Sequence, residues 1–266
     1  MLKFICLGSG SCGNCYYLMT GEGGILIDAG IGIRSIKKVF REYGLSLSHL
    51  KAIFVTHEHA DHIKAVGVVS NEFRIPVFAT ESVHMGMIRN YNMTVKVKTE
   101  NVRVLTKNET VRMAGFQITP FEVPHDSADN VGYRLEADGK TFCLITDAGC
   151  VTEAIKENVS RADYLVIEAN YDANMLAMGP YPVYLKRRIS GGMGHMCNDD
   201  TAKLLVENGF EHLKHVWLCH LSEENNHPEL VRKTIESRIQ SMGYIVGKDV
   251  LIDVLKRKVP SLLYEL

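Results

Sequence analysis

The sequence predicts an α/β protein in which two β-sheets face each other and helices cover their outer faces. Two observations carry this prediction. Each half of the chain alternates buried strands with amphipathic helices, and a middle region, about residues 95–146, is rich in strands. Two such halves can bury their apolar faces against one another in a layered core. The 266 residues contain no linker, repeat or low-complexity segment, so we expect a single domain over residues 1–266.

The first half begins with a run of expected strands, separated by turns and helices. The glycine-rich turn GEGG joins the second strand to the third, and a helix over residues 33–44 precedes the fourth. That helix has apolar residues at helical spacing, and Gly44 ends the pattern. A further helix lies on each side of the fifth strand. The expected strands are residues 2–7 (LKFICL), 15–20 (CYYLMT), 23–30 (GGILIDAG), 51–56 (KAIFVT) and 75–80 (IPVFAT).

The second half returns to alternation after the strand-rich middle. A helix is expected after Gly149, further helices before about Asn208, and another from Pro228. Asn198 or Asp199 is expected to cap the helix that begins near them. The strands between these helices are residues 163–169 (DYLVIEA), 214–220 (KHVWLCH) and 249–254 (DVLIDV).

Composition excludes several classes of protein. The chain has 30 Lys and Arg against 31 Asp and Glu, so attraction to a polyanion requires a local basic patch. The first ten residues lack a basic region and a cleavage pattern and read as a strand, not as a signal peptide. No continuous apolar run reaches the ~18 residues that cross a bilayer. Seven scattered cysteines, an odd number, suit reduced thiols, so we expect a cytoplasmic protein.

The motif THEHADH carries the strongest chemical signal. It supplies His57, His59, Asp61 and His62 within one short loop after a buried strand. A lone histidine is usually a packing or surface residue. Three imidazoles and a carboxylate in one turn destabilise the fold unless a cation organises them. The motif therefore predicts a metal site, with His57 and His59 directed to one position and Asp61 and His62 to another.

Three later strand ends supply further ligand types. His125 follows a strand in FEVPHD, Asp147 ends FCLITD, and His220 ends VWLCH. Open α/β folds place their sites at the carboxyl ends of strands, so these side chains are expected to meet the motif. Mixed imidazole and carboxylate ligands suit zinc, iron or manganese.

The chain resembles the metallo-β-lactamase superfamily over essentially its whole length, because it carries the motif HEHADH and then His125, Asp147 and His220 in that order. The resemblance implies a four-layer αββα sandwich and two divalent metal ions, zinc or manganese, with iron as a further option. It implies His57, His59 and His125 on one metal, Asp61, His62 and His220 on the other, and Asp147 between them. Asp28 in LIDAG matches the residue that supports the metal loop from beneath without binding the metal. A histidine at position 59 favours hydrolysis over the redox chemistry of the di-iron branch, which has glutamate there.

Two such metals, about 3.5–4 Å apart, hold a hydroxide between them, because a metal lowers the pKa of its bound water toward ~7. Asp61 lies beside this nucleophile in the predicted arrangement and orients it or takes its proton. The leaving oxygen still needs a proton. We assign that task to His195, because Glu168 at another strand end can keep its imidazole protonated. A surface glutamate and an ordinary loop histidine are the competing interpretation. The pair also resembles the donor pair of phosphodiesterases similar to transfer-RNA 3′-processing enzymes.

The branch of the superfamily is indicated by three segments. The stretch from Ala169 to Asp199, with GSGSCGNC near the start and CHLSEENN near the end, closely resembles the YycJ/WalJ/VicX family. That family comprises proposed 5′–3′ exonucleases acting on DNA. Met196 and Cys197 stand where the family usually has Leu and Ser. The stretch between Asp147 and His220 is too short for the insertion of the β-CASP nucleases.

Substrate contacts are assigned from local chemistry. Lys186, Arg187 and Arg188, with Tyr181 and Tyr184, give a basic and aromatic helix that can bind phosphates and stack a base. An ordinary solvated helix face is the competing interpretation. The backbone amides of the GSGSCGNC loop are expected to face the metal site. Ser9, Ser11 and Asn14 in this loop are candidates for substrate phosphate. Gly8, Gly10 and Gly13 match a dinucleotide-binding spacing, but the run that follows reads as a strand where a helix is required.

The sequence therefore predicts a dinuclear metal-dependent phosphodiesterase, a 5′–3′ DNA exonuclease, with nucleic acid as its partner and no membrane. A thioesterase or lactonase with the same metals is the alternative in another reaction class, but it leaves His195 and Glu168 without a task. RNA and a small cyclic phosphodiester are alternative substrates. A third alternative is an interaction module that holds metal without turnover.

Overall fold

The computed structural model describes residues 1–208 and 212–266, which form two seven-stranded sheets. In spatial order, the first sheet contains β14 (Tyr264–Glu265), β1 (Lys3–Gly8), β2 (Cys15–Thr20), β3 (Gly23–Ile27), β4 (Leu50–Phe54), β5 (Val77–Ala79) and β6 (Val102–Val104). The second contains β13 (Leu251–Val254), β12 (His215–Cys219), β11 (Tyr164–Glu168), β10 (Lys140–Ile145), β9 (Val131–Ala137), β8 (Phe116–Glu122) and β7 (Val111–Met113).

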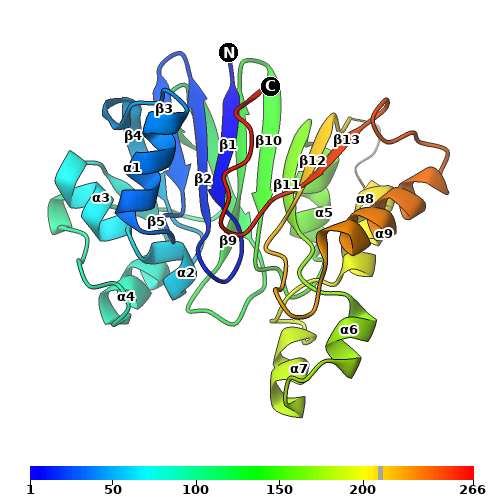
Figure 1. Cartoon of the computed structure of the whole chain (residues 1–266). Helices are drawn as coiled ribbons and strands as arrows, with labels where there is room; N and C mark the ends of the chain where they lie inside the picture. Colours follow the sequence, from blue (N-terminus) through cyan, green and yellow to red (C-terminus); the bar gives the residue numbers. More distant parts are fainter. Residues whose placement is uncertain (209–211) are drawn as a thin grey trace.

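Helices cover the outer face of each sheet (Figure 1). Those over the first sheet are α1 (Ile33–Glu42), α3 (Val66–Phe73) and α4 (Glu81–Arg89). Those over the second sheet are α5 (Glu153–Ser160), α8 (Asn198–Asn208) and α9 (Pro228–Gln240). Three shorter helices are α2 (Ala60–Ile63), α6 (Ala173–Met178) and α7 (Val183–Ile189). The order of layers is that of an αββα sandwich, and the predicted fold class is confirmed.

Large aromatic side chains fill the space between the two sheets. Phe4 on β1 lies 5.0 Å from Phe142 and 4.8 Å from Trp217 on the second sheet, measured between ring centroids. Phe54 on β4 meets Tyr133 on β9 edge to face at 5.6 Å. All five side chains are buried. Strands β1, β4, β10 and β12 also bury their opposite faces against helices, which explains why strands such as KAIFVT are apolar almost throughout.

Parallel pairing sets the location of the functional residues. Strands β3 to β6 pair in parallel in the first sheet, and strands β10 to β13 do so in the second. Their carboxyl ends therefore reach one edge of the sandwich, and the loops that follow them lie together there. Helices α2, α6 and α7 lie at this edge, at the bottom of Figure 1.

The last segment of the chain crosses from one sheet to the other. After β13 it runs past this edge and returns as β14, which pairs antiparallel with β1 (Figure 1). Ser261 fixes the crossing, because its backbone N–H donates to the Cys6 carbonyl at 2.8 Å and its hydroxyl accepts from the Cys6 N–H at 2.9 Å. The sequence patterns did not predict β14, which is only two residues long.

One predicted helix cap is wrong. Helix α8 begins at Asn198, so neither Asn198 nor Asp199 occupies the position before it. The buried Asn198 side chain instead exchanges hydrogen bonds with Asn226 at 3.0 and 2.9 Å. The Cys197 sulfur accepts from the backbone N–H of Asp200 at 3.4 Å and takes the capping place.

The seven cysteines are free thiols, as expected. In the part of the chain that the structure describes, no helix combines the length and the apolar character that crossing a bilayer requires.

Candidate metal centre

The loop after β4 carries the histidine motif, and Asp28 lies beneath it. Asp28 is fully buried, and its carboxylate accepts hydrogen bonds from the Thr56 backbone N–H at 2.8 Å and the Thr56 hydroxyl at 2.9 Å. Its Oδ2 lies 2.7 Å from Nδ1 of His62. The Asp28 carboxylate accepts here, so a proton of His62 lies on Nδ1, and Nε2 is the nitrogen left to face the candidate metal position. Gly30 allows the loops to meet, because a Cβ there would lie 1.6 Å from the Asp61 carbonyl.

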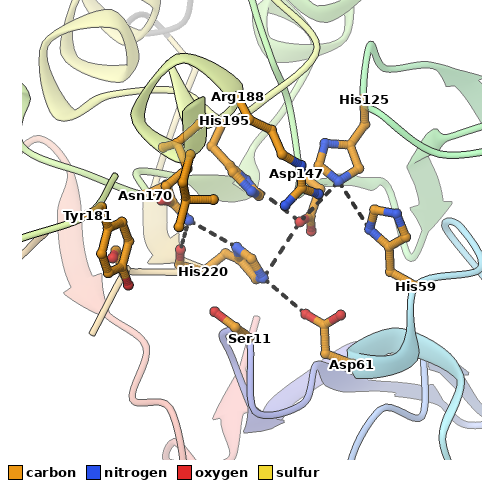
Figure 2. A pocket seen from close by; sticks show the side chains of 13 residues that line it. Ser11, His59, Asp61, His125, Asp147, Asn170, Tyr181, Arg188, His195 and His220 are labelled. Carbon is orange, nitrogen blue, oxygen red and sulfur yellow. Dashed lines mark hydrogen bonds and ion pairs between the residues drawn. The ribbon is translucent and has the colours of Figure 1, made fainter. Parts of the chain in front are cut away.

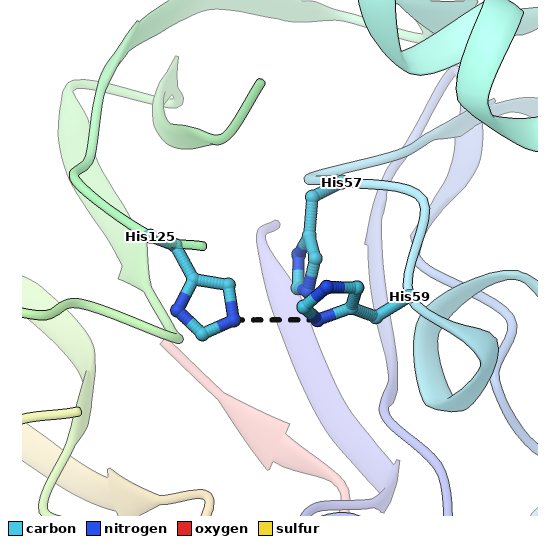
Figure 3. A group of neighbouring side chains, drawn as sticks. All are labelled: His57, His59 and His125. Carbon is cyan, nitrogen blue, oxygen red and sulfur yellow. Dashed lines mark hydrogen bonds between the residues drawn. The ribbon is translucent and has the colours of Figure 1, made fainter. Parts of the chain in front are cut away.

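Three imidazoles converge at the first candidate position (Figure 3). His57 and His59 come from the loop after β4, and His125 comes from the loop after β8. Nε2 of His125 lies 3.3 Å from Nδ1 of His59. Nδ1 of His125 donates to the Gly194 carbonyl at 2.9 Å, so its Nε2 is the nitrogen with the free lone pair. Each of the three residues therefore offers a ring nitrogen to one small volume.

Asp61, His62 and His220 form the second group. Asp147 lies between His125 of the first group and His220 of the second (Figure 2). His220 Nε2 is 3.4 Å from Asp61 Oδ2. Asp147 Oδ2 lies 3.2 Å from His62 Nε2, whereas its Oδ1 lies 3.7 Å from His125 Nε2 and 3.6 Å from His220 Nε2. One carboxylate thus faces ligand types from both groups.

This donor set fits divalent cations. His57 is fully buried, and its Nε2 has no hydrogen-bond partner among the described residues. A buried polar atom without a partner is unfavourable unless a ligand satisfies it. Burial, reinforced by the neighbouring His62, holds the pKa of His57 well below its usual value, so the ring is neutral and can donate a lone pair. Imidazole and carboxylate together suit zinc, manganese or iron.

The carboxylates of the site are held ionised. Burial alone would raise the pKa of Asp61, but the nearby His62 and His220 outweigh it and lower that pKa to about 2. In the same way, His220 and His62 overcome the burial of Asp147 and hold its pKa well below the usual range. Both carboxylates are therefore available as metal ligands at neutral pH.

His195 and Glu168 meet at the wall of the same site. His195 Nδ1 lies 2.8 Å from Glu168 Oε1. Burial opposes a charge on this imidazole, but the Glu168 carboxylate outweighs it and raises the pKa of His195. Glu168 is fully buried and has other contacts, since its Oε2 accepts from the Ala148 N–H at 2.8 Å and its Oε1 lies 3.2 Å from His220 Nδ1. The pair therefore connects a potential proton donor to the second group of ligand candidates.

Three residues of the site have left-handed backbone conformations. Asp28, Asp147 and His220 have φ values of 58°, 53° and 53°. Each follows the last residue of a strand or comes within two residues of it. For a residue with a Cβ this conformation costs roughly 1–2 kcal/mol relative to the ordinary regions. The turn that directs these side chains inward is therefore unfavourable locally and is maintained by the surrounding contacts.

A cavity of about 250 Å³ opens over the cluster. Its walls combine ligand candidates with residues of the α6–α7 region and of two loops (Figure 2). The lining residues outside the metal cluster are Ser11, Asn170, Tyr181, Leu185, Arg188, Ile189, His195 and Ser222. The cavity is thus lined by the hydroxyl groups of Ser11 and Ser222 and by the Arg188 guanidinium and the Tyr181 ring.

The candidate substrate contacts divide into two groups. Ser11, Tyr181 and Arg188 line the cavity. Arg188 also pairs with Asp126, with Nε 2.5 Å from Oδ2 and Nη2 3.1 Å from Oδ1. Lys186 donates instead to the Ala177 carbonyl at 2.6 Å. The exposed Arg187 and Tyr184 lie on the same helix but are not part of the lining.

Ser9 and Asn14 do not face the cavity. Both are fully buried. The Ser9 hydroxyl accepts from the backbone N–H of His220 at 2.9 Å, and Asn14 Nδ2 lies 2.9 Å from His62 Nε2. The structure thus gives both residues contacts to ligand candidates, and neither belongs to the cavity lining. Ser9 is buried and Ser11, two residues later, lines the cavity, a difference that composition alone does not reveal.

Asn170 is a site residue that the sequence analysis missed. It lines the cavity, and its Nδ2 donates to the His220 carbonyl at 2.7 Å. It follows Glu168 by two residues at the end of β11, so its position after a strand was a signal that could have identified it. Asn130 was missed as well, and its Nδ2 donates to the Asp147 carbonyl at 2.9 Å. These two amides hold the strained turns at His220 and Asp147.

Comparison with known proteins finds a matching family and relatives that cover nearly the whole chain. Residues 24–220 match the family described as the beta-lactamase superfamily domain. The chain is 33% identical to "Exodeoxyribonuclease YycJ" of Bacillus anthracis over 98% of this chain and 97% of the relative. It is 34% identical to "Exodeoxyribonuclease WalJ" of Streptococcus pneumoniae over 93% of this chain and 91% of the relative.

Solved structures share the fold at lower sequence identity. Zinc-bound PqqB from Methylobacterium extorquens aligns with a TM-score of 0.75 and 19% identity, covering 99% of this chain and 100% of that chain. The short form of human tRNase Z aligns with a TM-score of 0.64 and 15% identity, covering 98% of each chain. These similarities establish the αββα architecture.

Proposed function

Because the chain belongs to the beta-lactamase superfamily and, within it, to the family of the YycJ/WalJ exodeoxyribonucleases, we propose that it is a dinuclear phosphodiesterase that degrades DNA as a 5′–3′ exonuclease. As a member of this family it is a hydrolase, and its His/Asp cluster suits divalent metal ions. The contact of His195 with Glu168 at 2.8 Å carries the proposal for phosphodiester chemistry. Ligand residues come from loops of both sheets, so we also propose that the two halves form one catalytic domain.

His57, His59 and His125 would hold one cation, and Asp61, His62 and His220 the other, with Asp147 shared. Zinc or manganese suits this set, and iron is a further option. When bound, such cations supply a water nucleophile near neutral pH and stabilise the charge that develops on the phosphate. Asp28 would support the set, because it fixes the His62 tautomer through the contact at 2.7 Å.

Asp61 and His195 divide the proton transfers in this proposal. Asp61 lines the cavity and its low pKa keeps the carboxylate ionised; in this proposal it orients the attacking water or accepts its proton. His195 has Nδ1 engaged by Glu168, which leaves Nε2–H for the leaving oxygen. Glu168 favours the protonated ring, and a positioned donor of this kind contributes about 10²–10⁴-fold to the rate.

The cavity walls support a nucleic-acid strand as substrate. Arg188 offers a guanidinium for phosphate and Tyr181 a ring for stacking, while Ser11 offers a hydroxyl on another wall. DNA is preferred over RNA on the names of the two relatives, both of which are exodeoxyribonucleases. The exposed Arg187 continues the positive charge along α7.

One panel of substrates tests the reaction class. Purified protein with added zinc or manganese is offered duplex DNA, single-stranded RNA, bis-p-nitrophenyl phosphate and a thioester. We expect hydrolysis of DNA and of the small phosphodiester, and loss of both on chelation. The polarity is measured with two DNA substrates, one labelled at the 5′ end and one at the 3′ end. The end whose label is released first is the end at which degradation begins. Thioester cleavage without phosphodiester cleavage would overturn the proposal.

A second experiment tests the substrate wall. Arg187→Ala combined with Arg188→Ala should weaken DNA binding and reduce its dependence on salt, because exposed cations release counterions from DNA. Lys203→Ala combined with Arg232→Ala removes the same charge from helices α8 and α9 and serves as the control. Unchanged affinity and salt dependence in the Arg187/Arg188 variant would exclude α7 from the substrate path.

A further inference from the structure

A second basic segment lies at the edge of the sandwich that carries the metal centre. It comprises Lys256, Arg257 and Lys258, which follow β13 after the single residue Leu255. Strand β13 pairs in parallel with β12, and the Leu255 N–H continues this pairing to the Leu218 carbonyl at 2.9 Å. The segment therefore leaves β13 at the same edge at which His220 follows β12. Figure 1 shows the chain crossing this edge on its way from β13 to β14.

Arg257 holds this basic segment against both loops that supply hydroxyl groups to the cavity. Its Nη1 donates to the Leu221 carbonyl at 3.1 Å, next to Ser222. Its own carbonyl accepts from the Cys12 thiol at 3.5 Å, next to Ser11. Ser11 and Ser222 both line the cavity. The basic segment is thus one residue removed from two parts of the cavity wall.

Lys256 and Lys258 are the free charges of this segment. Arg257 pairs with Glu223 at 2.9 Å and is occupied in holding the loop. Lys256 and Lys258 are both exposed, and within residues 1–208 and 212–266 neither takes part in an ion pair. Two uncompensated ammonium groups near a polar cavity create a local positive potential on a chain whose net charge is only −1.

The two basic surfaces lie on different sides of the cavity. Figure 2 shows Arg188 of α7 across the ligand cluster from Ser11, and Ser11 is the side to which the segment 256–258 is attached. A polyanion that has one phosphate at the cluster carries further phosphates beyond the cavity, where cations on either side can contact them. A small phosphodiester confined to the cavity would not extend to the two lysines.

We propose that Lys256 and Lys258 bind the phosphate backbone of the nucleic-acid substrate, on the side of the cavity away from α7. This inference rests on the proposed function, because it assigns these lysines to the same substrate. The interaction is between ammonium groups and phosphates and is independent of base sequence. Each phosphate that the lysines neutralise releases counterions, so binding should depend strongly on salt.

The test compares Lys256→Ser/Lys258→Ser with the wild-type protein. A fluorescently labelled DNA duplex is titrated in EDTA, which prevents hydrolysis, at several salt concentrations. Loss of two phosphate contacts should reduce the magnitude of the slope of log K against log salt by about 1.8. With zinc or manganese restored, kcat/KM for this duplex should fall about tenfold at low salt. Hydrolysis of bis-p-nitrophenyl phosphate should not change.

The matched control is Lys233→Ser/Lys248→Ser, which removes the same charge. Lys248 precedes β13 at its opposite end, Lys233 lies on α9, and both are exposed. An unchanged salt slope in the Lys256/Lys258 variant, or an equal change in the control, would overturn the inference, as would absence of duplex binding by the wild type. Failure of the proposed function is a separate result, in which the wild type with metal hydrolyses no phosphodiester, including the small one.

Discussion

His125 donates a hydrogen bond from Nδ1 to the carbonyl oxygen of Gly194 at 2.9 Å, one residue before His195. The loop that carries the proposed proton donor therefore also fixes the tautomer of a proposed metal ligand. Outer contacts of this kind typically change metal affinity by about 10–100-fold. The position of His195 and the position of His125 should respond together to any shift of this loop.

Gly194→Ala should disturb both functions. A Cβ at this position would lie 2.2 Å from the carbonyl oxygens of Arg188 and Ile189, so the loop has to move. We expect lower metal content by elemental analysis together with a lower rate on bis-p-nitrophenyl phosphate. Gly192→Ala is the control, because a Cβ there meets nothing within 4 Å. Full metal content in the Gly194 variant would show that the carbonyl contact is dispensable.

His195→Ala should reduce the rate without releasing metal. With DNA, whose leaving oxygen needs a proton, we expect a loss of about 10²–10⁴-fold. With bis-p-nitrophenyl phosphate the loss should be much smaller, because p-nitrophenolate is stable as an anion. Glu168→Gln is not an equivalent test, since Glu168 also contacts His220 at 3.2 Å. Equal losses on both substrates, or a missing metal ion, would argue against a proton donor.

Asp28→Asn should weaken the second metal position. The amide has one acceptor oxygen where the carboxylate has two, so it cannot accept both from the Thr56 N–H, now at 2.8 Å, and from His62 Nδ1–H, now at 2.7 Å, and the support of the His62 ring is weakened. We expect metal affinity to fall about 10–100-fold at one of two positions, measured by competition with a chelating dye. Two unchanged binding steps would contradict the support assigned to Asp28.

Asp253→Asn tests a pH effect away from the metal centre. The hydrogen bond from His215 at 2.9 Å holds the pKa of Asp253 below its usual value, aided by the Tyr264 hydroxyl at 3.0 Å. A lowered pKa stabilises the folded state above the unfolded value of about 3.9, and this contribution disappears as the pH falls through the folded value.

Because Asp253 is 44% exposed, the effect should stay within about 1 kcal/mol. Urea unfolding in EDTA, which keeps metal release out of the measurement, should show the wild type more stable than Asp253→Asn at pH 7. The difference between the two proteins should begin to shrink below about pH 4 and disappear as the pH falls through the lowered pKa of Asp253. A difference that grows as the pH falls would show that the sign is wrong.

The sequence predicted the layers and the ligand candidates because both depend on short-range patterns. The apolar strands end where His57, Asp147 and His220 begin, and parallel pairing then brings these ends to one edge. The spacing of HEHADH identifies its ligand types without any knowledge of the remaining fold. The roles of these residues as ligands remain a prediction that the metal measurements above address.

The remaining features depend on contacts between distant segments. Ser9 and Ser11 are two residues apart, yet one is buried under His220 and the other lines the cavity. The sequence around Asn198 is typical of a helix cap, but its side chain forms hydrogen bonds with Asn226, which is distant in the sequence. The segment 256–258 is a basic run that acquires its position only through the crossing from β13 to β14. Local composition contains no information on any of these pairings.

The left-handed turns at Asp28, Asp147 and His220 have a consequence for protein engineering. Glycine is the residue that tolerates such a conformation best, so redesign for thermal stability alone would favour glycine at these places. Each such replacement would remove a group on which the proposed reaction depends. Directed evolution toward heat resistance should therefore be screened for turnover at every round, because the turns that glycine would stabilise most readily carry the side chains that the proposed reaction needs.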